Sequence, residues 1–134
     1  MSTANVLSRY GAVQVTTSSP GQVLVMLYDG LFRFLGEARA ALVARERARA
    51  GERIGRAHAI LEYLASTLDP SHAPELCDNL QALYLFCMNR LIEANVQQDP
   101  ARVEEVLKVL APLRDAWREV ITKQPTPPKE AVAL

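Results

Sequence analysis

The sequence contains few of the side chains that bind metals or carry out acid–base chemistry. Its 134 residues include only two histidines, His58 and His72, and two cysteines. Neither histidine follows a glutamate by three residues, which is the spacing that a helical di-iron site requires. Glycine-rich phosphate loops, nucleophile elbows and the Cys/His spacings of zinc sites are also absent from the sequence. We therefore predict a protein that is not an enzyme and that uses no metal and no cofactor.

The sequence also lacks net charge and a long apolar run. Its 15 basic and 15 acidic residues cancel, so no long-range field attracts nucleic acid or anionic lipid. The arginines between Arg39 and Arg56 alternate with acidic residues and have no aromatic residue among them, which indicates a solvated face. No run of 18 apolar residues and no basic-plus-apolar leader occurs. These observations predict a cytoplasmic protein that neither binds nucleic acid nor inserts into a membrane.

The two cysteines, Cys77 and Cys87, fall within one expected helix. Their separation of 10 residues corresponds to about 15 Å along a helix, whereas a disulfide needs Cα atoms within about 7 Å. They therefore cannot pair within that helix. We predict two reduced, mostly buried thiols, as is usual in the cytosol.

What the sequence does contain is a series of four apolar patterns with helical period, separated by short breaks. Asp99 is the expected N-cap of the last helix, and Pro112 predicts a kink or a local break inside it. The run Ala44–Ala50 consists of good helix formers without an apolar stripe and is expected to be a solvated helical overhang or a hinge, with Gly51 as its end. The expected helices run from Pro20 into the forties, from about Glu52 to Leu68, from about Pro74 to Asn95, and from Asp99–Pro100 to about Lys123. Four such helices joined by short loops predict an all-α, antiparallel four-helix bundle.

Both ends of the chain differ in composition from these helices. Residues 1–18 are polar and β-branched, with apolar anchors at Tyr10, Val13 and Val15 and no matching strand elsewhere. This segment is either a frayed terminus or an extended strap that docks on the first helix. Residues 124–134 are proline-rich and are expected to be a disordered tail. The predicted organisation is a strap over 1–18, a bundle domain over 19–123 and a tail over 124–134.

The first expected helix has more apolar surface than a bundle helix needs. Its main stripe covers about 140° of a helical wheel, and near 200° once Val25 and Phe32 at its edges are included, where roughly 100° is usual. Such a helix must be covered on two flanks, either by its own chain or by a partner. Surplus apolar surface next to a detachable arm favours a protein that binds a helical or extended partner segment.

An ordered series of short motifs resembles the flagellin-specific export chaperones of the FliS family. The series extends from Tyr10 to Trp117, and no single motif in it is decisive. It comprises Thr17-Ser18-Ser19-Pro20, Met26-Leu27-Tyr28-Asp29-Gly30, Arg56-Ala57, Leu68-Asp69, Asn79-Leu80, Leu83-Tyr84, Arg90-Leu91, Ala94-Asn95 and Leu113-Arg114-Asp115-Ala116-Trp117. One departure is the stretch Ser71-His72-Ala73-Pro74, where family members often have a Gly-Gly turn.

The resemblance implies a four-helix bundle whose client is the C-terminal segment of newly made flagellin. It also implies that the chaperone prevents premature polymerisation of flagellin and presents it to the flagellar type III export gate, and that the strap around Tyr10 covers part of the client groove. Whether a co-chaperone or a regulatory protein shares this surface is left open, as is the alternative of a self-associating structural bundle. The candidate partner-binding residues are Tyr10, Val13, Val15, Val25, Tyr28 and Phe32.

Overall fold

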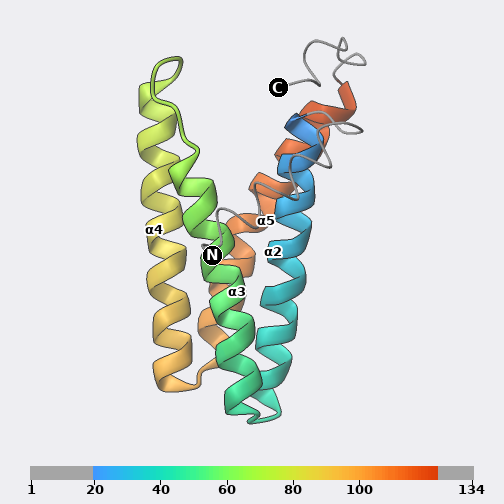
Figure 1. Cartoon of the computed structure of the whole chain (residues 1–134), viewed down its shortest axis with the longest axis vertical. Helices are drawn as coiled ribbons and strands as arrows, with labels where there is room; N and C mark the ends of the chain where they lie inside the picture. Colours follow the sequence, from blue (N-terminus) through green and yellow to red (C-terminus); the bar gives the residue numbers. More distant parts are fainter. Residues whose placement is uncertain (1–19, 124–134) are drawn as a thin grey trace, which may run out of the picture. The chain divides into compact units, whose positions relative to one another are not determined.

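The computed structural model describes residues 20–123, and this part of the chain consists of four helices without a strand (Figure 1). The helices are α2 (Pro20–Val43), α3 (Arg47–Ser66), α4 (Pro74–Gln97) and α5 (Pro100–Lys123). The expected all-α bundle class is therefore confirmed. The strap predicted over 1–18 and the tail predicted over 124–134 lie outside the described residues, and the three-segment organisation stays a prediction.

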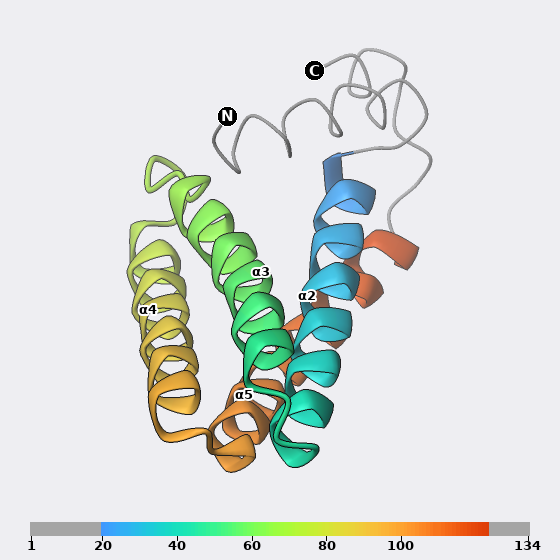
Figure 2. The same ribbon diagram turned by 60° about the horizontal axis from the view of Figure 1, so that its bottom comes forward.

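The described helices contribute to two compact parts of the chain. The central part is Leu31–Val109 and contains segments of all four helices, while the terminal part contains the start of α2 up to Gly30 and the end of α5 from Leu110. Connections of a few residues make successive helices of the central part run in opposite directions (Figures 1 and 2).

The core of the central part combines large aliphatic residues with alanines. Leu31, Leu35, Leu61 and Leu91 are fully buried, and burial of one such side chain contributes about 1.5–3 kcal/mol. Alanines on all of α2, α3 and α4 are also completely buried: Ala38, Ala50, Ala57 and Ala94. Small side chains at these positions let neighbouring helices approach closely. None of the described residues that are buried is polar or charged, so apolar packing alone holds this core together.

In the terminal part, Tyr28 of α2 and Leu110 of α5 are both fully buried. An ion pair between Asp29 and Arg118 joins the same two helices at the surface. Helix α5 runs through Pro112 to Lys123 without interruption, so of the two expected effects, a kink or a local break, the break is not formed. Proline removes one backbone hydrogen bond, which would have gone to the carbonyl of Lys108. Because Lys108 is exposed, water can satisfy that carbonyl.

The start of α3 corrects the expectation for the run Ala44–Ala50. Only residues 44–46 form the turn, and α3 begins at Arg47, five residues before the predicted Glu52. Gly51 lies inside α3 and does not separate the run Ala44–Ala50 from this helix. The helix starts early because Ala50 is completely buried and donates its backbone N–H to the carbonyl of Glu46 over 2.9 Å. Packing of this small residue outweighs the cost of about 1 kcal/mol for a glycine in a helix interior.

Two helices of the central part end at a residue that is not glycine but has a left-handed backbone conformation. At the end of α2, Glu46 donates its backbone N–H to Ala41 over 2.9 Å and Arg45 donates to Leu42 over 3.1 Å, which is a Schellman motif. Arg45 has a positive φ of 60°, and Gln98 has one of 53° at the end of α4. Glycine is the usual residue at this left-handed position, and another residue costs roughly 1–2 kcal/mol there.

The start of α5 and the end of α4 are joined by side chains. The carboxylate of Asp99 accepts the backbone N–H of Ala101 over 3.0 Å, which confirms the predicted N-cap. Across the two helices, Arg90 of α4 pairs with Glu105 of α5 at 3.1 Å, and Arg102 of α5 pairs with Glu93 of α4 at 3.7 Å. This network fixes the register of α4 against α5 through charges that sit at the surface.

Both cysteines lie on α4 and neither forms a disulfide, as predicted. Cys87 is buried, whereas Cys77 is only half-buried and donates its thiol to the carbonyl of Asp69 over 3.0 Å. Burial raises the pKa of the Cys87 thiol from 9.0 to about 12, because desolvation disfavours the thiolate.

We expect iodoacetamide at about pH 8 to alkylate Cys77 at least a hundredfold faster than Cys87, because only the accessible thiol can supply a reactive thiolate. Mass spectrometry of peptides after timed quenching measures the two rates. In urea, where both thiols are exposed, the two rates should become similar. Equal rates in the folded protein would contradict the burial of Cys87.

The raised pKa of Cys87 also sets the sign of a pH effect on stability. Between pH 9 and about 12 the folded protein keeps this proton while the unfolded chain loses it. The unfolded state therefore binds fewer protons in this range, and the contribution of Cys87 to the free energy of unfolding falls as the pH rises. Below pH 9 the contribution is complete and constant.

No helix in the described stretch, residues 20–123, combines the length and the apolarity that crossing a membrane requires.

Candidate partner-binding surface

Large apolar side chains that remain exposed are concentrated on α4 in the central part. Elsewhere the described residues expose only Met26 and Val43 on α2 and Val120 on α5. The exposed large apolar residues of α4 are Leu76, Leu85, Phe86, Ile92 and Val96. Scattered exposed apolar residues are normal, whereas several on one helix make it a candidate binding surface.

Four of these residues lie between the middle of α4 and its end, and we call them the α4 stripe: Leu85, Phe86, Ile92 and Val96. Leu85, Ile92 and Val96 follow one another at steps of seven and four residues, so they lie along one face of the helix. This line is about 16 Å long at 1.5 Å per residue. Phe86 lies beside it, and the guanidinium of Arg90 covers its ring at 5.0 Å. The exposed fractions along the line, 50% for Leu85, 51% for Ile92 and 75% for Val96, increase toward the end of α4.

The polar residues around the α4 stripe carry little free charge. Gln81, Asn89 and Asn95 flank its line on the helical wheel and are exposed and uncharged. Glu93 and Arg90 lie on the side of the line where Phe86 lies, and they are paired with α5 and with each other, the latter contact at 2.7 Å. A partner would therefore meet an apolar line with one uncharged edge and one edge of paired charges, which suits the apolar face of an amphipathic helix.

The sequence-predicted partner-binding residues are placed differently. Val25 and Phe32 on α2 are half-buried. Tyr28 is completely buried, so in this structure it supports the helix from within and presents no surface to a partner. Tyr10, Val13 and Val15 lie outside the described residues, and their role stays a prediction. Among the predicted partner-binding residues that the structure describes, only Val25 and Phe32 are therefore partly accessible to a partner.

The α4 stripe was missed by sequence reasoning, although a signal for it exists. The predicted stripe of this helix followed Leu76, Leu80, Leu83, Tyr84, Cys87, Leu91 and Ala94. Five of these are buried, but Leu83 is only half-buried and Leu76 is exposed, so the prediction was wrong at the start of the helix. Leu85, Ile92 and Val96 fall on another side of the wheel, which should be polar in an ordinary amphipathic helix. The same surplus of apolar residues that singled out the first helix is thus also present on α4.

The described residues include no group of three or more His, Cys, Asp and Glu side chains placed to hold a metal ion. His58 and Glu62, one turn apart on α3, pair with each other at 2.8 Å.

A family model described as "Flagellar protein FliS" matches residues 3–124 of this chain. The chain belongs to the FliS family. It is 30% identical over 124 residues to the flagellar secretion chaperone FliS of Bacillus subtilis, covering 92% of each chain. It is 32% identical over 128 residues to the protein of that name from Salmonella typhimurium, covering 92% of this chain and 95% of the relative. The corresponding Escherichia coli protein is 34% identical over 106 residues, covering 78% of each chain.

FliS membership confirms the resemblance drawn from the motif series between Tyr10 and Trp117. The match to the FliS family model also includes most of the N-terminal segment and all four described helices. The chain is therefore related to flagellar secretion chaperones over almost its whole length, and the α4 stripe lies within the matched region.

Proposed function

We propose that this protein is a cytoplasmic flagellar export chaperone that binds the C-terminal segment of flagellin. In this role it prevents premature polymerisation of flagellin and delivers it to the export gate of the flagellar type III apparatus. The role is one of binding and not of catalysis. The observation that carries the proposal is the exposed α4 stripe on a chain whose relatives are named flagellar secretion chaperones.

The chemistry of the surface supports a client that becomes helical on binding. A disordered segment loses conformational entropy when it orders, so it needs an apolar surface in return. The α4 stripe provides one with three or four contact points spaced by one to two helical turns. Val25 and Phe32 on α2 are further contacts in this proposal, because they lie at the edge of the main α2 stripe and are half-buried.

The N-terminal segment is proposed to compete with the client. Tyr10, Val13 and Val15 provide apolar anchors in a stretch that has no strand partner in the sequence. Docked on the bundle, this segment would shield apolar surface until flagellin replaces it. Such competition lowers the apparent affinity for the client by the fraction of molecules in which the segment is released.

Co-expression of the chain with flagellin from the same organism, followed by affinity purification, tests the proposed function. We expect a stable complex with intact flagellin and none with flagellin that lacks its C-terminal segment. Calorimetric titration with that segment should show a negative heat-capacity change and little salt dependence, since apolar burial dominates. Failure to co-purify, combined with light scattering that shows the free chain to be an oligomer, would favour the self-associating bundle instead.

A further inference from the structure

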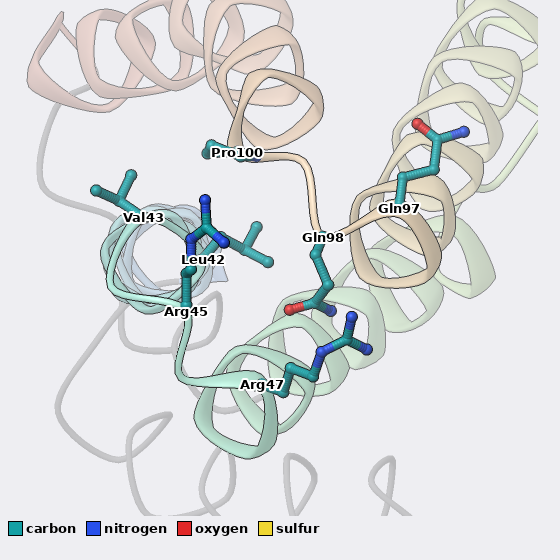
Figure 3. Close-up of a pocket in the computed structure, with 7 residues that line it drawn as sticks. All are labelled: Leu42, Val43, Arg45, Arg47, Gln97, Gln98 and Pro100. Carbon is teal, nitrogen blue, oxygen red and sulfur yellow. The ribbon is translucent and has the colours of Figure 1, made fainter.

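A hollow of about 500 Å³ lies at one end of the central part, between the α2–α3 turn and the α4–α5 turn (Figure 3). Arg45 and Arg47 line it from the first turn, and Gln97 and Gln98 line it from the second. Apolar side chains complete the lining, and these are Leu42, Val43 and Pro100. The hollow thus combines two cations, two amides and an apolar wall, and it is separate from the residues of the α4 stripe.

The side chains of the two arginines in the hollow make no polar interactions within the described part of the bundle. Within residues 20–123, the side chains of Arg45 and Arg47 form no hydrogen bond, ion pair or ring contact, whereas those of Arg53 and Arg90 form ion pairs with carboxylates. Positive charge is also disfavoured at the start of a helix, and Arg47 is the first residue of α3. Stability of the bundle therefore does not explain why guanidinium groups stand at both positions.

Backbone conformation gives an independent indication at the same place. Arg45 and Gln98 have the only positive φ values among the non-glycine residues in the described part of the chain, 60° and 53°. Both occupy the helix-end position that glycine fills at no steric cost. Two larger side chains are kept there, and both line the same hollow. Strained residues of this kind concentrate at sites that bind a ligand.

The groups that line the hollow define the ligand chemically. Gln98 uses its amide N–H in a 2.6 Å hydrogen bond to the carbonyl of Asn95, which leaves its amide oxygen as an acceptor. In Figure 3 this oxygen is turned toward the side on which Arg45 lies, whereas the guanidinium of Arg47 lies on the side of the amide nitrogen. A matching ligand carries a carboxylate for the guanidinium groups, an N–H for the amide oxygen and an aliphatic group for Val43 and Pro100. A peptide has all three groups, whereas a phosphate ion has neither of the last two.

We propose that this hollow binds an acidic peptide segment of a partner protein. Acidic side chains of the segment pair separately with Arg45 and with Arg47, whose guanidinium groups point apart in Figure 3. A backbone N–H of the segment donates to Gln98, and an aliphatic side chain lies against Val43 and Pro100. The site is independent of the proposed flagellin client, because it lies outside the α4 stripe and depends on charge. The chaperone would then be able to hold its client and be recognised by a second protein at the same time.

Nuclear magnetic resonance titration of the ¹⁵N-labelled full chain with a peptide Gly-Leu-Asp-Glu-Leu-Gly tests this proposal. We expect shifts at the backbone and guanidinium resonances of Arg45 and Arg47 and at the side-chain amide of Gln98. Arg45→Gln and Arg47→Gln should each weaken binding about threefold to tenfold, as expected for a partly exposed charge-assisted hydrogen bond. The matched control is Arg49→Gln, an exposed arginine nearby that does not line the hollow, and it should change binding less than twofold.

Three further ligands identify the chemistry. The uncharged peptide Gly-Leu-Asn-Gln-Leu-Gly, sodium phosphate and a short thymidine oligonucleotide should all leave these resonances unchanged. Equal shifts with the uncharged peptide would show that charge does not matter, and equal shifts with phosphate or oligonucleotide would show a general anion site. Either result, or no shift with the acidic peptide, would overturn the proposal.

A second variant separates binding from folding. Arg45→Gly removes the guanidinium and also removes the steric cost of the left-handed backbone conformation. It should therefore raise the midpoint of thermal unfolding and weaken binding of the acidic peptide as much as Arg45→Gln does. A lower midpoint, or unchanged peptide affinity, would show that Arg45 is kept for the fold and would contradict the proposal.

Discussion

Replacing Leu91 by alanine is expected to lower the free energy of unfolding by about 2–5 kcal/mol. Leu91 is completely buried on α4, within the core that also contains Leu61 and Leu64 of α3. The substitution removes several methyl and methylene groups and leaves a cavity that a close-packed core refills only in part. Urea denaturation followed by circular dichroism at the helical band measures the change, and a shifted midpoint with an unchanged slope identifies it as a loss of stability.

The neighbouring residue provides the matched control. Ile92 is also a branched aliphatic residue on α4, but it is 51% exposed, and Ile92→Ala should change the free energy of unfolding by no more than about 0.5 kcal/mol. Alanine has the higher helix propensity, which offsets part of the lost contact. Similar losses for the two variants would mean that α4 turns a different face toward the core.

Leu91 also illustrates how much of the fold could be predicted from the sequence. The three- and four-residue spacing of large apolar residues on α4 placed Leu91 in the core, and Pro74 gave the correct start of that helix. Asp99 likewise marked the start of α5. Large apolar side chains, prolines and N-caps therefore carried the prediction, because each has a local effect that does not depend on the rest of the chain.

The errors arose where a small residue or a long-range contact decides. Ala50 is completely buried, but alanine gives no signal in an apolar pattern, and the first turn of α3 was therefore missed. Tyr28 was proposed as a binding residue and is also completely buried. A helical wheel orders residues by direction, but it does not reveal how far each direction is covered by other helices. The distinction between core and surface on α2 therefore required the tertiary structure.

The same reasoning explains why the α4 stripe was not predicted. The main apolar stripe of this helix assigns one face to the core. That assignment does not say whether apolar residues on the other faces are buried or exposed. Exposure of Leu85, Ile92 and Val96 depends on the fact that α3 and α5 cover other sides of α4. Apolar residues outside the main stripe therefore indicate a candidate binding surface on α4 as well as on the first helix.

The double variant Leu85→Ser, Ile92→Ser is expected to reduce affinity for the flagellin C-terminal segment by about a hundredfold, while the bundle stays folded. Each side chain is half exposed, so a partner can bury roughly half of its surface, and each loss corresponds to about 1.4 kcal/mol or tenfold. Fluorescence anisotropy with a labelled segment measures the affinity. The control is Glu62→Ser, Lys108→Ser, which truncates two exposed residues of α3 and α5 and should change affinity less than twofold.

This experiment also decides between the α4 stripe and the residues predicted on α2. Phe32→Ala removes a half-buried ring. We expect it to reduce the affinity for the client less than the double variant does, because less of the Phe32 side chain is accessible to a partner. If a client segment contacts both helices at separate points, the losses from Phe32→Ala and Ile92→Ser should add within about 0.5 kcal/mol, as they do for sites without shared partners. An unchanged affinity in the double variant, together with a large loss in Phe32→Ala, would place the client on α2 alone. The α4 stripe would then need another explanation, and self-association through α4 could be tested directly by light scattering of the double variant against the unmodified chain.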